Sequence, residues 1–164
     1  MKFLVYYCHF INKKNLYNYL NIYTDGSSSG NPGPGGIGII IQSKNFYKEY
    51  SYKFRYTTNN RMELFAIIYA IKKINKFIYS NINIYSDSKY IIDIINKNFK
   101  IKKNYDLWYK LFKFNIKIIK FNWIRGHNNN YYNEKCNKLA QKAIKNNNKQ
   151  ILIDYFYEKK IYKK

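Results

Sequence analysis

Residues 23–36 read Tyr-Thr-Asp-Gly-Ser-Ser-Ser-Gly-Asn-Pro-Gly-Pro-Gly-Gly, and an apolar run precedes them. Asp25 therefore stands at the junction between a predicted strand and a turn rich in glycine and proline. The arrangement recurs later in the chain, where Asp87 comes just after the apolar run Ile82–Tyr85. Both acids are thus expected near the ends of strands, where open α/β sheets form their sites.

A third acid, Glu63, closes the segment Thr-Thr-Asn-Asn-Arg-Met-Glu and lies at the start of a predicted helix over 60–78. Apolar residues recur along that helix at intervals of three and four, which is typical of one buried face. They are Leu64, Ile67, Ile68, Ile71, Ile74 and Ile78. The third acid therefore comes from a different kind of element than the other two.

The other patterns complete an α/β chain. Strands are predicted at Leu20–Thr24, Ile37–Gln42, Phe46–Phe54, Ile82–Tyr85 and Ile116–Ile124. Further helices are predicted at Ser88–Asn96, at Tyr105–Phe112, and around Cys136, Leu139, Ala140 and Ala143. Three antiparallel strands followed by alternating helices and strands indicate a mixed sheet covered by helices. Asp25 and Asp87 fall at the carboxyl ends of its parallel strands.

The chain of 164 residues has the length of one domain with a sizeable core, which we place at 20–147. Residues 1–19 are interpreted as a basic, aromatic extension of unknown role, and 148–164 as a loosely held basic tail. Hydrophobic residues make up 46% and aromatic residues 20%, which excludes global disorder.

The formal net charge of +21 favours a polyanionic partner, and nucleic acid more than an anionic membrane. Only three arginines occur, while Lys, Asn, Ile and Tyr are abundant; all four have codons rich in A and T, so genome drift contributes to the charge. Cys8 and Cys136 lack metal-ligand spacing. No apolar segment reaches the roughly 18 residues of a membrane span, so we expect a cytoplasmic protein without membrane attachment.

Each of the three acids also has a structural interpretation. Asp25 precedes Gly26, a common turn pair; Glu63 fits a capping box with Asn60; and Asp87 or Ser86 fits the cap of the next helix. Their conjunction at one end of a sheet favours a different hypothesis. Carboxylates held close together repel one another unless a cation lies between them, and oxygen ligands favour Mg²⁺ or Mn²⁺ over zinc.

Two further motifs need interpretation. Gly33, Gly35 and Gly38 satisfy G-x-G-x-x-G, but Ile39 and the residues after it continue as a strand, so we reject a dinucleotide site. We expect these glycines to form a turn whose backbone closely approaches a substrate. His127 lies in a polar loop after a predicted strand; such a residue is usually inert, but near a metal site it serves proton transfer or product release.

With these residues in view, the chain resembles type 1 ribonuclease H. The matching pieces occur in family order over about 20–147: Tyr-Thr-Asp-Gly-Ser with Gly-Asn-Pro-Gly-Pro-Gly-Gly, Thr-Thr-Asn-Asn-Arg-Met-Glu-Leu, Ser-Asp-Ser-Lys-Tyr, Asp-Leu-Trp, and Trp-Ile-Arg-Gly-His with Asn-Glu-Lys-Cys. The resemblance implies the ribonuclease H-like fold, a five-stranded mixed sheet flanked by helices on both faces. It also implies a monomer that hydrolyses the RNA strand of RNA–DNA hybrids and needs no small-molecule cofactor.

The resemblance further implies two metal ions, Mg²⁺ with Mn²⁺ as an alternative, and products with 3′-hydroxyl and 5′-phosphate ends. Asp25 would bridge both ions, Glu63 and Asp87 would hold the ion near the leaving oxygen, and His127 would assist as a catalytic residue. The substrate-binding positions of the family fall on Gly26, Ser28, Asn31, Thr58, Asn59, Asn60 and Lys89. Among them, Thr58 corresponds to a phosphate pocket on the DNA side, and the asparagines to contacts across the minor groove.

Two departures from the family pattern stand out. The fourth family acid is replaced by Asn137, which still offers a ligand oxygen but no charge, so cleavage is expected to be slowed. The stretch between Tyr90 and Asp106 is short, and only the lysine-rich segment 97–103 remains of a basic protrusion. These departures leave two alternatives open: a catalytically impaired hybrid-binding module, and another nuclease or transposase with the same fold.

Overall fold

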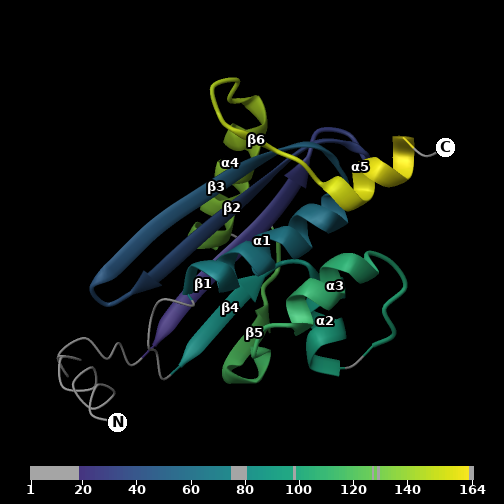
Figure 1. Ribbon diagram of the computed structural model, residues 1–164. Helices are drawn as coiled ribbons and strands as arrows, with labels where there is room; N and C mark the ends of the chain where they lie inside the picture. Colours follow the sequence, from purple (N-terminus) through teal and green to yellow (C-terminus); the bar gives the residue numbers. More distant parts are fainter. Residues whose placement is uncertain (1–18, 75–80, 98, 127, 129, 163–164) are drawn as a thin grey trace, which may run out of the picture.

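The computed structural model describes residues 19–74, 81–97, 99–126, 128 and 130–162 (Figure 1). Nearly all of the expected N-terminal extension, His127 and the last residues of the helix predicted over 60–78 lie outside these described residues.

A six-stranded sheet runs through the molecule in the order β5-β4-β1-β2-β3-β6 (Figure 1). The strands are β1 (Leu20–Ser28), β2 (Gly33–Ser43), β3 (Phe46–Thr57), β4 (Ile82–Ser86), β5 (Ile119–Trp123) and β6 (Ile151–Leu152). The first three pair antiparallel, whereas β4 runs parallel to β1 and β5 parallel to β4. The predicted mixed sheet is confirmed, but it has one strand more than the expected five.

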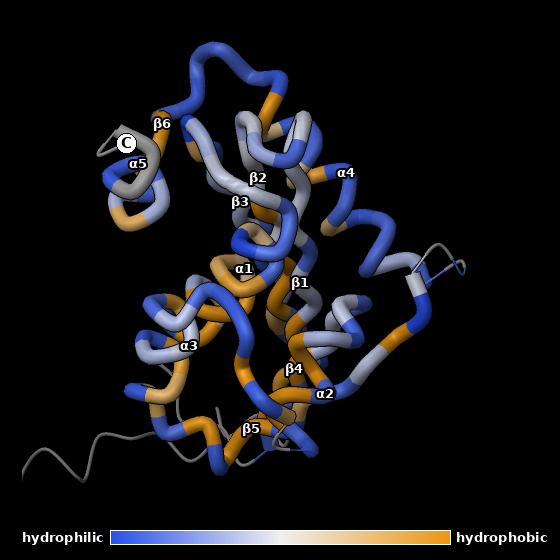
Figure 2. Tube along the Cα trace, turned by 90° about the vertical axis from the view of Figure 1, so that its right-hand side faces the viewer, coloured by the Kyte–Doolittle hydropathy of each residue, from blue (hydrophilic) through white to orange (hydrophobic). Residues whose placement is uncertain are grey.

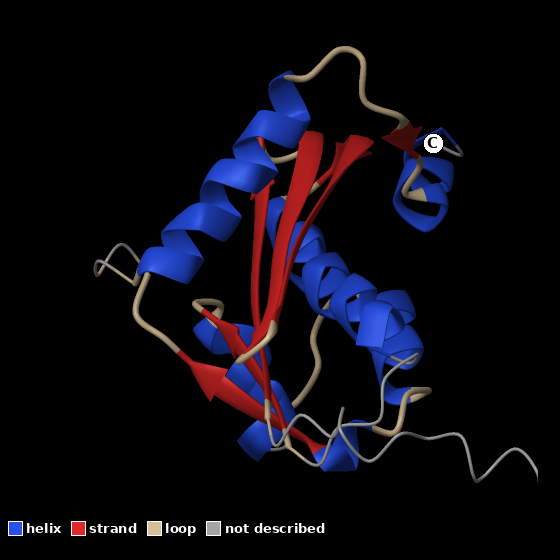
Figure 3. Ribbon diagram, turned by 90° about the vertical axis from the view of Figure 1, so that its left-hand side faces the viewer, coloured by secondary structure: helices blue, strands red, loops and turns tan. Residues whose placement is uncertain are grey.

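Helices cover both faces of this sheet, as expected (Figure 3). They are α1 (Asn59–Ile74), α2 (Lys89–Lys97), α3 (Tyr105–Phe112), α4 (Tyr131–Lys145) and α5 (Tyr155–Tyr162). Helix α4 packs on β1, β2 and β3, while α1 lies on the opposite face with α3 against it. The apolar residues gather on α1 and the central strands, and α4 turns a hydrophilic side outward (Figure 2).

The apolar stripe predicted for the first helix is the centre of the core. Leu64, Ile67 and Ile68 have no exposed surface, and Ile71 and Ile74 are at most 4% exposed. Burial of each such side chain contributes roughly 1.5–3 kcal/mol, so the stripe fixes which face of α1 meets the sheet. The N-terminal part of α1, with Glu63, is thereby held against β1.

The glycines of β2 have a different use from the one expected. An added Cβ at Gly36 would lie 2.2 Å from the carbonyl oxygen of Ala140, and one at Gly38 would lie 2.0 Å from that of Cys136. Both contacts are with the backbone of α4. The predicted turn was therefore wrong, since Gly33, Gly35 and Gly38 all lie on β2, and Gly38 instead lets helix α4 approach the strand closely. Rejection of a dinucleotide site is supported, because β2 continues through this segment.

The C-terminal segment is not the loosely held tail that we expected. Ile151 and Leu152 pair in parallel with Lys53 and Phe54 of β3, which adds the sixth strand. Asp154 and Glu158 behind it are only 2% and 3% exposed. Asp154 accepts hydrogen bonds from Thr57 of β3 and Arg61 of α1, and Glu158 accepts from Arg55 of β3.

One strand boundary also needs correction. Residues Ile116–Ile118 form a short 3₁₀ helix, and the strand predicted from Ile116 begins only at Ile119. The described part of 99–104, between α2 and α3, has no helix of its own, which agrees with the predicted loss of a protrusion. Among the described helices, none is long and apolar enough to cross a membrane.

Candidate active site

Three acidic side chains meet at one end of the sheet. Asp25 lies near the end of β1 and Asp87 follows β4, and the parallel pairing of these strands brings their carboxyl ends together. Glu63, near the N-terminal end of α1, is added by the packing of this helix on β1. One carboxylate oxygen from each of the three residues lies within 4.8 Å of the others. The predicted convergence is therefore confirmed.

This cluster is electrostatically costly for the protein without a cation. Burial first, and then the charge of Asp87, raises the pKa of Asp25 to about 7, while hydrogen bonding to Asn137 partly offsets the rise. The pKa of Glu63 is raised well above its usual value by burial and by the charges of Asp25 and Asp87. Both raised pKa values mean that, without a bound cation, the site disfavours the charged forms of Asp25 and Glu63.

The capping-box explanation for Glu63 does not hold. The backbone N–H groups of Arg61 and Met62 donate to the carbonyl of Thr58, and α1 begins at Asn59, so Asn60 is not the helix cap that Glu63 would serve. At the next helix, the Ser86 hydroxyl accepts the backbone N–H of Ser88 at 3.2 Å.

These local bonds leave the carboxylates of Glu63 and Asp87 available to the cluster. An added Cβ at Gly26 would meet the backbone nitrogen of Glu63 at 2.3 Å, so the close approach of β1 to α1 depends on this glycine.

Two amides of α4 line the cluster, and sequence reasoning found only one of them. Asn137 turns its oxygen to the side-chain nitrogen of Gln141, 2.6 Å away, so its NH₂ group serves Asp25. The residue that was missed is Asn133, which is 2% exposed and donates to Asp87 at 3.2 Å. Asparagine is so common in this chain that its presence at 133 carried no local signal.

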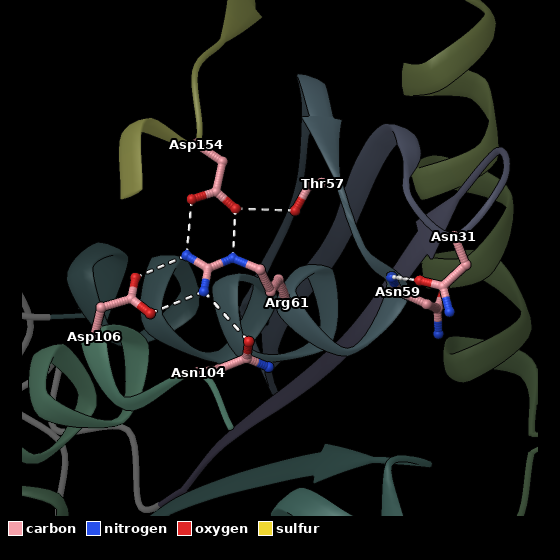
Figure 4. A network of polar contacts seen from close by, with 7 residues as sticks. All are labelled: Asn31, Thr57, Asn59, Arg61, Asn104, Asp106 and Asp154. Atoms are coloured by element: carbon pink, nitrogen blue, oxygen red, sulfur yellow. Dashed lines mark hydrogen bonds and ion pairs between the residues drawn. The ribbon is translucent and has the colours of Figure 1, made fainter. Parts of the chain in front are cut away.

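The predicted substrate residues surround this end of the sheet. The backbone N–H of Asn59 donates to the side-chain oxygen of Asn31 at 3.2 Å, which ties the turn before β2 to the start of α1 (Figure 4). Thr58 lies between them and β3, and Asn60 is exposed in the first turn of α1.

The other predicted substrate-binding residues, Gly26, Ser28 and Lys89, lie on β1 and α2. Gly26 and Ser28 lie on β1, with Gly26 buried and Ser28 half-buried. Lys89 opens α2, and its ammonium group lies 2.5 Å from a carboxylate oxygen of Asp93. His127 lies outside the described residues, so its expected role stays a prediction.

The residues present fit a divalent cation. The Oδ2 atom of Asp25 and the Oε2 atom of Glu63 are both buried, and neither has a hydrogen-bond partner among the residues that the structure describes. A buried carboxylate oxygen without a partner costs free energy that an ion would recover. All three acidic residues offer carboxylate oxygens as ligand atoms, and oxygen ligands suit a hard cation such as Mg²⁺. Asp25, Glu63 and Asp87 would hold it.

We expect stability to depend on pH and cation in a specific way. A folded pKa of about 7 for Asp25, against 3.8 for an ordinary carboxyl, means that stability falls as pH rises between these values when a chelator is present. Above pH 7, added Mg²⁺ is expected to raise Tm by roughly 2–6 °C, and near pH 4 by much less. Calorimetry with chelator and with Mg²⁺ at both pH values measures this. Equal Mg²⁺ shifts at both would contradict the assignment.

The comparisons with known proteins agree with this geometry. The model of the RNase H family matches residues 17–145. A ribonuclease H of Trichodesmium erythraeum is 46% identical over 139 residues, covering 76% of this chain and 87% of the relative. A ribonuclease H of Wigglesworthia glossinidia brevipalpis is 42% identical over 154 residues, covering 85% and 95%.

Among solved structures, that of LC11-RNase H1 in complex with an RNA/DNA hybrid aligns with a TM-score of 0.68 and 26% identity. The alignment covers 77% of this chain and 96% of that one. The family model spans most of the chain and includes all three acids of the cluster. The chain therefore belongs to the type 1 ribonuclease H family of endoribonucleases.

Proposed function

We propose that this protein cleaves the RNA strand of RNA–DNA hybrids, with Asp25, Glu63 and Asp87 as the catalytic carboxylates. The observation that carries the proposal is the buried cluster of these three acids, whose oxygens approach within 4.8 Å of one another. Its membership in the ribonuclease H family gives the reaction class, and the solved relative that holds an RNA/DNA hybrid gives the substrate class.

Two bound divalent ions would activate the attacking water and stabilise the charge that develops on the leaving oxygen. The protein's own contribution is to fix the ligands rigidly. Asp25 is held within β1, Glu63 is held by the packing of α1, and Asp87 is oriented by the amide of Asn133. The products proposed for this reaction carry a 3′-hydroxyl and a 5′-phosphate.

The recognition surface proposed for the hybrid includes the amides of Asn31, Asn59 and Asn60. Amide groups both donate and accept hydrogen bonds, and they suit the 2′-hydroxyls and base edges exposed in the minor groove of an A-like duplex. The high positive charge of the chain supports binding through the phosphates and predicts strong salt dependence.

The function is tested with a labelled RNA–DNA hybrid, a matched RNA duplex and a matched DNA duplex. Each is incubated with the full chain and Mg²⁺ or Mn²⁺. We expect cleavage of the RNA strand of the hybrid alone, and none with a chelator. Binding of the hybrid with no cleavage under either ion would overturn the proposal in favour of a hybrid-binding module, which the uncharged Asn137 favours.

Asn137→Asp is expected to raise activity. In the present side-chain arrangement the oxygen of Asn137 accepts from Gln141, and its NH₂ group faces Asp25, so it supplies no negative charge to a cation. A carboxylate at this position would add a charged ligand and strengthen cation binding.

We expect the variant to increase kcat at limiting Mg²⁺ by about three- to tenfold, a gain on the order of 1 kcal/mol. Titration of the cleavage rate against Mg²⁺ measures this, and Gln141→Ala alone controls for loss of the amide contact. If Asn137→Asp changes neither the rate nor the Mg²⁺ requirement, the amide does not limit catalysis.

A further inference from the structure

A cavity of about 500 Å³ lies beside the active site, between the start of α1 and the C-terminal helix α5. One wall consists of the predicted hybrid contacts Asn31, Thr58 and Asn60. Among the described residues, none of the three clustered acids lines it. The cavity therefore adjoins the surface proposed for the hybrid, but it is distinct from the position where a strand is cut.

The opposite wall is aromatic and comes from the segment that sequence reasoning took for a loose tail. Phe156 and Tyr157 line the cavity, and Phe156 leaves 55% of its surface exposed. A phenylalanine that stays half-exposed in the native protein loses the free energy that its burial would give. The exposed ring of Phe156 therefore offers an apolar face to a ligand bound in the cavity.

Helix α5 is held in place by a network of polar contacts that fixes this aromatic wall (Figure 4). Asp154 accepts two hydrogen bonds from the Arg61 guanidinium, at 2.6 and 2.8 Å, and one from the Thr57 hydroxyl at 3.0 Å. Glu158, one turn further, pairs with Arg55. The guanidinium also lies 5.7 Å from the Phe156 ring and 5.6 Å from the Tyr157 ring. The C-terminal wall is thus joined to the first turn of α1.

The rim of the cavity is basic. Lys102 and Lys103 lie on it, both are exposed, and neither forms an ion pair with an acid in the part of the chain that the structure describes. Lysines beside an exposed aromatic ring suit a sugar–phosphate backbone, since the ammonium groups attract the phosphates and the ring packs against the sugar. The ring lacks a hydrogen-bonding group, so it favours a sugar without a 2′-hydroxyl.

On this basis, which rests on the proposed function and on the DNA-side phosphate pocket that the resemblance implies at Thr58, we propose that Phe156 of α5 contacts a deoxyribose of the uncut strand. The C-terminal segment is then a substrate-binding element that helps to select DNA as the uncut strand. The two lysines on the rim would attract phosphates of the same strand. The acids of the cluster face the RNA strand on the other side of the minor groove.

Phe156→Ala is expected to raise the KM for a hybrid about three- to tenfold and to leave kcat within about twofold, because the residue touches substrate but not the reacting atoms. Tyr155→Ala is the matched control: Tyr155 is the adjacent aromatic residue, is 75% exposed, and does not line this cavity. It is expected to leave KM unchanged. Phe156→Leu keeps an apolar contact with Arg61 while removing the ring, and Tm is measured for all three variants.

Fluorescence anisotropy in an Asp25→Asn background measures binding without cleavage, with a hybrid and with an RNA duplex of the same sequence. Phe156→Ala and Phe156→Leu should weaken binding of the hybrid and leave binding of the RNA duplex nearly unchanged. Equal losses for both duplexes, or losses that Tyr155→Ala reproduces, would overturn the inference. Failure of the parent chain to cleave hybrids would refute the proposed function instead, and the binding comparison would still decide the role of Phe156.

Discussion

Asp25→Asn is expected to reduce hybrid cleavage by at least about a thousandfold, a loss of roughly 4 kcal/mol or more of transition-state stabilisation. The substitution keeps the shape of the side chain but removes the charge at the centre of the cluster, where Asp25 approaches both Glu63 and Asp87. A cation held by two carboxylates is bound more weakly than one held by three. Single-turnover cleavage of a labelled hybrid at saturating Mg²⁺ measures the loss.

The same variant should be more stable than the parent chain in the presence of a chelator. Burial and the charge of Asp87 raise the pKa of Asp25, so the carboxylate destabilises the folded protein at neutral pH and an amide does not. A gain of about 1–2 kcal/mol is expected, below the roughly 4 kcal/mol that a rise in pKa from 3.8 to about 7 implies in full.

Glu49→Gln is the matched control for Asp25→Asn, because Glu49 lies on β3, pairs with Lys135 of α4 and is outside the cluster. It should cleave hybrids at the parent rate. An Asp25→Asn protein that loses activity because it is unfolded would lack hybrid binding as well, so retained binding with lost cleavage identifies the catalytic role. Cleavage within tenfold of the parent rate would show that the acid cluster does not carry the reaction.

The acid cluster was accessible from the sequence because each acid stands at a recognisable boundary. The apolar runs before Asp25 and Asp87 predict strands, and parallel strands end at the same edge of a sheet. The helical stripe after Glu63 likewise predicts which face of α1 is buried. Each of these patterns is local in the sequence. The pairing of the strands in the sheet, with α1 packed on it, then brings the three acids close together.

The C-terminal segment was missed for the opposite reason. Residues 148–164 show little apolar periodicity, and the acids that fix them find partners far away in the chain: Asp154 bonds Arg61, and Glu158 bonds Arg55. These partners are separated by 93 and 103 residues. No pattern within a short window reveals such a pair, so the segment was interpreted from composition alone. The role of Gly38 was missed similarly, since it depends on the approach of α4.

Arg61→Met should destabilise the protein by about 3–5 kcal/mol, the usual cost of removing one partner from a buried ionic network. The Arg61 side chain is 1% exposed and forms two-pronged hydrogen bonds with both Asp154 and Asp106 (Figure 4). Burial by itself would lower the pKa of this guanidinium, but the bonds to Asp106 and Asp154 outweigh burial and raise the pKa, so the group stays charged. Its removal leaves two carboxylates without their cation. Unfolding in urea, followed by circular dichroism, measures the cost.

Two further variants separate the network from a general effect of losing a positive charge. Lys97→Met removes a cation whose side chain is 55% exposed and pairs with Asp93 on the surface, and it should leave stability nearly unchanged. Adding Asp106→Asn and Asp154→Asn to Arg61→Met removes the stranded charges, and it should recover part of the loss. If Arg61→Met costs no more than Lys97→Met, the network does not hold α5 in place. The aromatic wall of the cavity would then need another support, because Phe156 and Tyr157 reach the start of α1 through this guanidinium.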